Sequence, residues 1–495
     1  MGKREEWGSR AGFLLAAIGS AVGLGNIWRF PYVAYENGGG AFLIPYFFAL
    51  LTAGIPILIL EFGVGHKFKG SAPLSFRRIS RNAEWLGWWQ VFISFIIMMY
   101  YVVIIAWSAN YIWFSVGLKW GKDTNAFLFS EYLHISKGVW NFGGIQWPIF
   151  FTLLGVWAVI FFILFRGVKA GIEKASKFLM PLLAVIMILF TIRGVTLPGA
   201  VKGLNVLLTP DFSKIFDANT WVAAYGQIFY SLSVAFAIMI TYSSYLPEKA
   251  EINNSAFITG FANSGFEFLA ALGVFGVIGF MSQSTGIPID KVAGQGVGLA
   301  FVVFPQIINQ LPAMNSLIGV LFFTALFIAG LTSAISILEV VIAAIMDKFM
   351  LSRKQAVIYS SLVGFLGSVI YTSGGGLYYL DIVDHFINAF GIVLSGITEV
   401  ILLGWFFNLT TIREHNNLLS DYRIGSWWEI MIRFVTPIIL GIMTVINFYN
   451  EFTKLFGGGD YPLNSLIVFG WGVALAAITF AVIVKTIPGY QKEGI

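Results

Sequence analysis

Runs of apolar residues long enough to cross a lipid bilayer recur along nearly the whole chain, and no other feature constrains its fold as much. A membrane-crossing helix needs about 20 largely apolar residues, and unpaired backbone is too costly in lipid for open sheets. The sequence therefore predicts an all-α polytopic membrane protein, a single transmembrane domain over 1–495 with about twelve helices. The expected spans are 11–36, 41–65, 87–117, 147–166, 175–195, 220–246, 255–282, 316–349, 355–373, 378–408, 427–450 and 463–486.

Charged side chains are too few to cover the surface of a soluble protein of this length. They make up 11% of the 495 residues, against 58% hydrophobic residues, whereas soluble domains carry roughly 25% charged residues. Cysteine is absent, which excludes disulfides, thiolate metal sites and cysteine nucleophiles. The net charge of +5 is interpreted as a topology signal, not as a nucleic-acid-binding surface.

Lys and Arg gather in alternate segments between the spans, most densely in 67–81 and 166–177. Positively charged loops stay on the cytoplasmic side, so we expect both termini in the cytoplasm and a multi-pass protein of the cell inner (plasma) membrane. The long segments 118–146 and 283–315 then lie outside. Prolines between short apolar stretches in the second segment predict small surface helices, which could act as a lid.

The first span contains residues that disfavour a continuous helix at its midpoint. Gly19, Gly23 and Gly25 accompany Asn26 there, and glycine is a poor helix former. Small residues four positions apart also allow two helices to pack closely, which is the alternative interpretation. The amide of Asn26 and the guanidinium of Arg29 need partners inside a span, and such residues usually line functional cavities. We therefore predict a break in this helix.

The sixth span carries a similar polar cluster, formed by Gln227, Ser231 and Ser233. Serine can also bond back to its own helix, but spans one and six occupy corresponding places in two sets of five. Paired interruptions in corresponding spans are typical of transporters built from inverted repeats, with the binding site between them. We expect a first repeat over 1–195, a second over 220–408, and two additional helices over 427–486.

Four motifs resemble those of the neurotransmitter:sodium symporter family, in particular its bacterial amino acid transporters. They are AVGLGNIWRFP at 21–31, ENGGGAF at 36–42, GQIF at 226–229 and AGLTS at 329–333. The resemblance covers nearly the whole chain. It implies a leucine-transporter-like fold, with a 5+5 inverted repeat and broken first and sixth helices. The long, disulfide-bonded second external loop of animal members is absent, which together with the missing cysteines indicates a bacterial protein. The sequence shows no nucleophile–base set or metal cluster, so we expect no enzymatic activity.

The resemblance implies two Na⁺ sites near the middle of the membrane, built from the oxygen atoms that a hard cation requires. The first would combine the substrate carboxylate with Ala21, Asn26, Ser231 and Asn263. The second would use the carbonyls of Gly19, Val22 and Ala329 and the hydroxyls of Thr332 and Ser333. Unwound backbone can supply such carbonyls because helical hydrogen bonds no longer hold them.

The resemblance also implies a substrate site between the two breaks. An amino acid carboxylate would meet the amides of Leu24 and Gly25 and the hydroxyl of Tyr101. The whole set comprises Ser20, Ala21, Leu24, Gly25, Ile97, Tyr101, Tyr230, Ser231, Ser233, Phe236, Ser333 and Ile337. Related monoamine transporters carry Asp where this chain has Gly23, so a substrate that brings its own carboxylate is favoured. Ala235 replaces a glycine of relatives and is expected to narrow the pocket or stiffen the break.

Glu267 stands where chloride-dependent relatives have a small polar residue, and we expect this acid to supply the negative charge that chloride supplies there. Its expected neighbours are Tyr46, Gln227 and Ser231. It could also protonate during the return step. The alternative is a glutamate that is hydrogen-bonded for structure.

Two charge pairs match the gates of the family. Arg29 and Asp384 match the external pair, above a thin lid formed by Tyr101 and Phe236. Arg4 and Asp347 match the internal pair, which Trp7 and Tyr245 would support. Pairs that form only when one side closes give a switchable contact of small net stability.

The predicted function is Na⁺-coupled secondary active symport, which imports a neutral, largely apolar L-amino acid by alternating access, independently of chloride. The partners are then Na⁺, as two ions in the family pattern, the amino acid and the lipid bilayer, with a homodimer possible and no nucleic acid. An amino acid-binding membrane sensor and an ion channel of the same fold are the alternatives. Uptake driven by a Na⁺ gradient separates all three.

Overall fold

The computed structural model describes residues 4–292 and 296–490, and these are almost entirely helical. Ten helical segments are long and apolar enough to cross a membrane. They are Gly39–Phe68, Arg81–Gly117, Trp147–Phe165, Val168–Val195, Asn253–Thr285, Asn315–Phe349, Arg353–Thr372, Gly376–Trp405, Ser426–Gly459 and Leu463–Thr486. With the broken first and sixth spans they make up the predicted set of about twelve, which confirms the all-α polytopic fold. The division into repeats stays a prediction, and the domain ends 1–3 and 491–495 lie outside the described residues.

The first span is interrupted where its glycines predicted. Helix α1 (Arg10–Ala21) ends before an extended Val22 (φ −76°, ψ 98°), and the chain resumes after Gly23 as α2 (Leu24–Trp28) and α3 (Phe30–Glu36). A Cβ added at Gly23 would lie 3.1 Å from both the Tyr101 and the Ser333 hydroxyl oxygens. A side chain at this position would therefore need these hydroxyls to shift by a few tenths of an ångström, although the φ of −122° suits any residue.

The sixth span is interrupted over residues 232–237, between α12 (Ala218–Ser231) and α13 (Ile238–Ser244). Three non-glycine residues of this segment have left-handed backbone, Ser233 (φ 53°), Ala235 (φ 63°) and Ala237 (φ 63°). Each such residue costs roughly 1–2 kcal/mol, so contacts from neighbouring helices must hold the segment in place.

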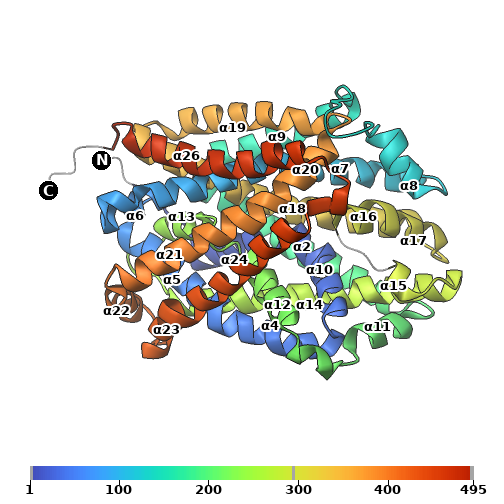
Figure 1. The fold of residues 1–495 in the computed structure, drawn as a ribbon, viewed down its shortest axis with the longest axis horizontal. Coiled ribbons are helices and arrows are strands. Elements are labelled where there is room, and N and C mark those ends of the chain that lie inside the picture. Colours follow the sequence, from blue (N-terminus) through green and yellow to red (C-terminus); the bar gives the residue numbers. More distant parts are fainter. Residues whose placement is uncertain (1–3, 293–295, 491–495) are drawn as a thin grey trace.

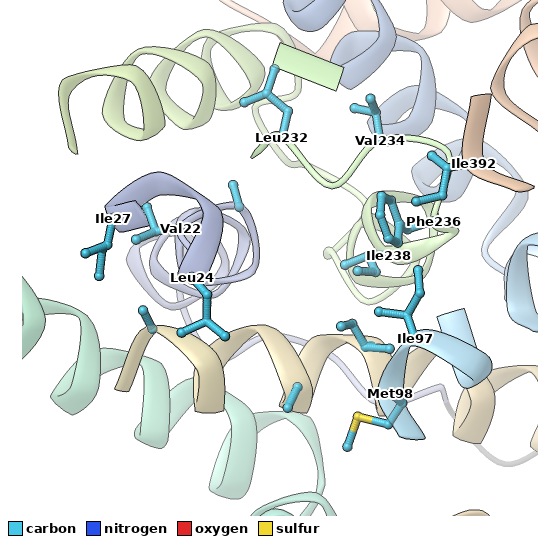
Figure 2. Close-up of a cluster of buried hydrophobic side chains, with 14 of the residues drawn as sticks. Val22, Leu24, Ile27, Ile97, Met98, Leu232, Val234, Phe236, Ile238 and Ile392 are labelled. Atoms are coloured by element: carbon cyan, nitrogen blue, oxygen red, sulfur yellow. The ribbon is translucent and has the colours of Figure 1, made fainter. Parts of the chain in front are cut away.

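Both breaks lie inside the bundle, next to the two long helices α7 (Glu84–Gly117) and α18 (Asn315–Phe349), which pack along each other. Figure 2 shows Val22 and Leu24 on one side and Val234 and Phe236 on the other, with Ile97 of α7 beside Phe236. All five are at most 8% exposed. The breaks are thus enclosed by apolar side chains, which keep bulk water away from the freed backbone.

The connecting helices gather at the two ends of the bundle (Figure 1). Helices α6 (Ala72–Ile79) and α22 (Leu409–Leu419) lie at one end, and α11 (Ala200–Leu208), α15 (Ile289–Val292) and α17 (Phe304–Gln310) at the other.

The segment 283–315 forms short helices as predicted, but they are not confined to the surface. Phe304 and Ile307 of α17 are fully buried, because this helix packs against α14 (Asn253–Thr285) and α18. Residues 293–295 of this segment lie outside the described residues, and its role as a lid stays a prediction.

Candidate functional site

The break in the first span frees backbone groups at the centre of the bundle. In a continuous helix the Gly23 amide would donate to the carbonyl of Gly19; here it donates to Asn26 Oδ1 over 2.9 Å. The amide of Leu24 points to the hydroxyl of Tyr101 at 3.4 Å instead of bonding to Ser20. The Ser20 carbonyl accepts bonds from the hydroxyls of Ser233 (3.0 Å) and Ser333 (3.3 Å). Carbonyl oxygens are therefore exposed to partners from other helices.

The residues expected to form the second Na⁺ site come together between α1 and α18. Ser333 Oγ lies 3.5 Å from the Val22 carbonyl and 3.2 Å from that of Ala329. Thr332 Oγ1 lies 3.1 Å from the Ala329 carbonyl, and a Cβ added at Gly19 would lie 3.4 Å from Thr332 Cβ. These five residues offer uncharged oxygen atoms from two helices as possible metal ligands, and such ligands suit Na⁺.

The side chains expected at the first Na⁺ site form a continuous chain across three spans. Asn26 Nδ2 donates to Asn263 Oδ1 over 2.8 Å, and Asn263 Nδ2 donates to Ser231 Oγ over 3.0 Å. Both asparagines are at most 1% exposed. Ala21, the remaining protein ligand, is the last residue of α1 and precedes the break directly. The first, sixth and seventh spans therefore meet at one buried group of oxygens.

Glu267 lies one turn beyond Asn263 on α14 and is fully buried. Its carboxylate accepts hydrogen bonds from the Tyr46 hydroxyl and from Gln227 Nε2 (2.6 Å), and Ser231 is a further partner. Within the part of the chain that the structure describes, no ion pair joins it to a basic side chain. The expected neighbours are thus present, and a negative charge here would lie next to the Asn26–Asn263–Ser231 chain.

The expected substrate residues lie at or beside the two breaks and on α7 and α18. A Cβ added at Gly25 would meet no atom within 4 Å, and Gly25 is partly exposed although it lies inside the bundle. Ile97, Phe236 and Ile337 retain 5–8% exposure there. Ser20 reaches the same region, where its Oγ lies 2.8 Å from Ser336 Oγ. Tyr101, Tyr230, Ser231, Ser233 and Ser333 are further members of this set. The expected set combines hydroxyls with aliphatic and aromatic groups.

The sequence did not identify the groups that hold the sixth-span break. Ser94 of α7 donates to the Phe236 carbonyl over 2.7 Å, and Ser395 of α21 (Val393–Trp405) contacts the Ala235 carbonyl at 3.4 Å. Glu61 of α5 (Ile55–Phe68) accepts a bond from the Ala235 amide over 2.6 Å. Ser94 and Ser395 are single polar residues in apolar runs, and that is the only sequence signal that they carry.

The Ala235 methyl group lies near α21. A Cβ added at Gly396 of α21 would lie 3.2 Å from Ala235 Cβ. Ala235 is 1% exposed. Its expected effect, to narrow the pocket or to stiffen the break, stays a prediction.

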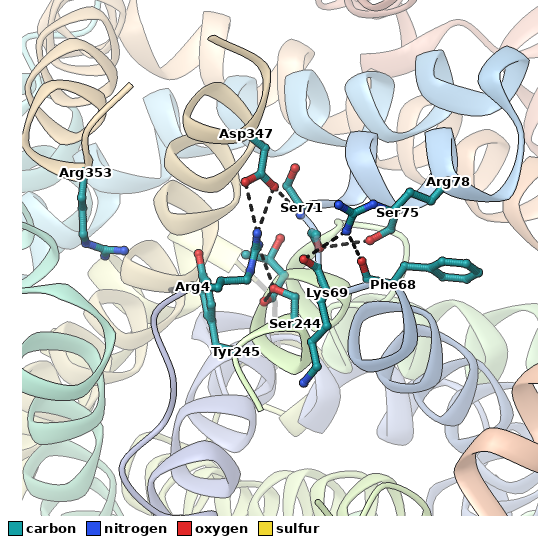
Figure 3. A network of polar contacts seen from close by, with 12 residues as sticks. Arg4, Phe68, Lys69, Ser71, Ser75, Arg78, Ser244, Tyr245, Asp347 and Arg353 are labelled. Atoms are coloured by element: carbon teal, nitrogen blue, oxygen red, sulfur yellow. Dashed lines mark hydrogen bonds and ion pairs between the residues drawn. The ribbon is translucent and has the colours of Figure 1, made fainter. Parts of the chain in front are cut away.

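The predicted internal pair is formed, as Figure 3 shows. Arg4 Nη1 lies 3.1 Å from Asp347 Oδ1, and Arg4 Nη2 donates to Ser244 Oγ over 2.9 Å. The Arg4 guanidinium also lies over the ring of Tyr245, 5.0 Å from its centre. Burial acts to lower the pKa of Arg4, but Asp347, Tyr245 and Glu339 together raise this pKa above its ordinary value.

Trp7 closes the same face from the amino-terminal side. Its indole Nε1 donates to the Tyr242 carbonyl over 2.8 Å, and its ring is 5% exposed. The backbone amide of Ser71 donates to Asp347 Oδ2 over 2.7 Å. The amino-terminal segment is thus bonded to α13 and, through Asp347, to the end of α18, so this end of the bundle is closed.

The predicted external pair is not formed. Arg29 and Asp384 make no ion pair within 4.0 Å in the described structure; the Arg29 guanidinium instead lies 4.8 Å from the centre of the Tyr230 ring. Asp384 accepts bonds from the Tyr100 hydroxyl (2.7 Å) and Asn388 Nδ2 (2.8 Å). The carboxylate already has two donors, which explains why it does not need the guanidinium in this arrangement.

Comparisons with known proteins agree with this architecture. The family model described as "Sodium:neurotransmitter symporter family" matches residues 4–128 and 119–491. An uncharacterized sodium-dependent transporter of Methanocaldococcus jannaschii is 45% identical over 491 residues, which cover 99% of each chain. The sodium-dependent dopamine transporter of Bos taurus is 30% identical, over 99% of this chain and 76% of that protein. The sodium- and chloride-dependent glycine transporter 2 of Xenopus laevis is 30% identical, over 99% of this chain and 70% of that protein. The protein is therefore a sodium-dependent membrane transporter, not an enzyme, and belongs to the sodium:neurotransmitter symporter family.

Proposed function

We propose that this transporter couples two Na⁺ ions to the import of a neutral, largely apolar L-amino acid, by alternating access and without chloride. The observation that carries the proposal is the juxtaposition of two groups of uncharged oxygens beside the two helix breaks. One group is centred on Asn26 and the other on Ser333. An α-amino acid has both a carboxylate to share with a cation and an ammonium group to meet freed carbonyls.

The absence of a side chain at Gly23 favours amino acids over amines. A Cβ at this position would already press on Tyr101 Oη and Ser333 Oγ, each 3.1 Å away. A longer acidic side chain, which could neutralise a bare amine, would need both hydroxyls to move. A substrate that supplies its own carboxylate can use the Tyr101 hydroxyl and the Leu24 amide instead.

The absence of chloride coupling is inferred from Glu267. A buried carboxylate that accepts bonds from Tyr46 and Gln227 places a fixed negative charge one turn from Asn263. This charge would attract a cation in the first Na⁺ site, as a bound chloride ion would do in a chloride-dependent transporter. Transport by Glu267→Ser, but not by the wild-type protein, should then depend on chloride.

Alternating access is inferred from the unequal gates. The Arg4–Asp347 contact closes one end, whereas Arg29 and Asp384 at the other end make no ion pair with each other. The two pairs would form in turn as the site faces one side and then the other. The cytoplasmic location of both termini, the plasma membrane, a homodimer and a bacterial source stay predictions.

Uptake into proteoliposomes tests the proposal. Each of the twenty amino acids is offered in a radiolabelled form with an inward Na⁺ gradient, with K⁺ in place of Na⁺, and with gluconate in place of chloride. We expect accumulation of one or a few apolar amino acids with Na⁺ alone. A channel would pass Na⁺ without an amino acid, and a sensor would bind an amino acid without accumulating it; either result contradicts the proposal.

A further inference from the structure

Two buried glutamates lie beside the sixth-span break, and neither belongs to the Na⁺ or substrate sites. Glu61 of α5 is fully buried and Glu399 of α21 is 1% exposed. Each has one satisfied oxygen: Glu61 Oε1 accepts from the Ala235 amide (2.6 Å) and Glu399 Oε2 from Gln90 Nε2 (2.6 Å). The other carboxylate oxygen of each, Glu61 Oε2 and Glu399 Oε1, has no donor, and neither has Gln90 Oε1.

The backbone at Ala235 links the helices that carry the two acids. Its amide bonds to Glu61, and its carbonyl contacts Ser395, which precedes Glu399 by one helical turn. An ionised Glu399 would repel an ionised Glu61. From α7 the pair is faced by Gln90, which is neutral, and no described Lys, Arg or His makes an ion pair with either acid.

Two ionised carboxylates cannot both be maintained in these surroundings. Moving one unpaired charge out of water is already costly, and a second like charge nearby adds repulsion that cannot be screened. A single proton bound between them would remove one charge and supply a donor to the unpaired oxygens. Glu267 provides the contrast, because both of its oxygens have donors.

We propose that Glu61 and Glu399 form a proton-binding site that holds one proton between them and is linked to the position of residues 232–237. The proton comes from solvent and binds a carboxylate oxygen, so no other reactant is needed. A carboxylate bonds more strongly than a carboxylic acid to the Ala235 amide. When that amide moves away, the pair should bind the proton more tightly, and by reciprocity proton release should favour the present arrangement of the break. This linkage to transport, but not the site itself, rests on the proposed function.

Infrared difference spectroscopy of the purified protein tests the site without requiring transport. We expect the wild-type protein at neutral pH to show the carbonyl band of a protonated carboxylic acid, shifted in deuterated buffer and lost in Glu399→Gln. The matched control is Glu451→Gln, since Glu451 is also buried but lies 2.9 Å from His385 Nε2. The control should retain the band. A wild-type protein with no such band would overturn the proposal even if the variants failed to fold.

Uptake measured at several pH values tests the linkage. At a fixed Na⁺ gradient, wild-type uptake should change with pH, whereas Glu399→Gln should lose this dependence because a carboxamide binds no proton there. Glu451→Gln should keep the wild-type profile. If Glu399→Gln instead binds one radioactive sodium ion fewer and keeps the acid band, the pair holds Na⁺ and the proposal is wrong. If the wild-type protein shows the acid band but no uptake at any pH, the proposed function is contradicted and the proton site is still supported.

Discussion

Replacing Asn26 by alanine should weaken Na⁺ and substrate binding together. Asn26 is 1% exposed and makes two hydrogen bonds, from the Gly23 amide (2.9 Å) and to Asn263 Oδ1 (2.8 Å). Its amide oxygen is also the expected Na⁺ ligand. A contact between a neutral dipole and a charged group contributes about 1.5–3 kcal/mol, so the Na⁺ affinity should fall roughly 10- to 150-fold. Because the substrate carboxylate is expected to share this ion, substrate affinity should fall with it at subsaturating Na⁺.

Binding of the transported amino acid in detergent, titrated at several Na⁺ concentrations, measures both affinities. High Na⁺ should restore most of the substrate affinity of Asn26→Ala, because mass action refills the weakened site. The matched control is Asn37→Ala, which removes a bond of 2.8 Å to the Val33 carbonyl at the end of α3. The control should bind as the wild-type protein does. A variant in which Na⁺ affinity falls and substrate affinity is unchanged at every Na⁺ concentration would refute the shared-ion reasoning.

Three further predictions concern space, gating and pH. Gly23→Ala should bind the amino acid at least several-fold more weakly, since the new methyl group would lie 3.1 Å from two hydroxyl oxygens that are expected to serve the substrate; the same titration measures this. Asp347→Asn removes a partly exposed ion pair worth about 0.5–1 kcal/mol. The chain has no cysteine, so Met239→Cys introduces a single reporter thiol. In the Asp347→Asn background this thiol should react about 2- to 5-fold faster with a reagent added from the cytoplasmic side. Burial lowers the pKa of His415 from 6.5 to about 4. Below pH 6.5 the unfolded chain therefore binds a proton at this histidine that the folded protein does not bind, so the stability of the fold decreases as the pH falls from 6.5 toward 4. His415→Gln should therefore lose less thermal stability than the wild-type protein between pH 7 and pH 5.

The first break could be predicted from the sequence because its causes are local. Glycines and an asparagine within one helical turn disfavour the helix wherever they occur, and the structure breaks at Val22 and Gly23. The long apolar spans could be predicted for the same reason, since the bilayer sets their length. The motif at 329–333 likewise indicated a pair of hydroxyls, and the structure places that of Ser333 beside the Val22 carbonyl.

The geometry of the second break could not be predicted, because its causes lie on other helices. Residues 232–237 contain no glycine, and the left-handed conformations of Ser233, Ala235 and Ala237 contradict their intrinsic preferences. The state of the external gate could not be predicted either. Asp384 accepts hydrogen bonds from Tyr100 and Asn388, and their approach to the carboxylate depends on the packing of the helices. Sequence spacing identifies possible partners but not which of them are in contact.

The unwound part of the sixth span is close to energetic balance, which suits a segment that moves. Its three left-handed residues cost roughly 3–6 kcal/mol together. Four hydrogen bonds from α1, α5, α7 and α21 oppose this cost, and at about 0.5–1.5 kcal/mol each they supply roughly 2–6 kcal/mol. The difference is no larger than the energy of one ion or substrate contact. A ligand that touches Ser231 or Phe236 therefore needs only a few kcal/mol of preference for one arrangement to change which arrangement dominates. The strain that makes this segment unpredictable from sequence is then the property that lets small ligands control it.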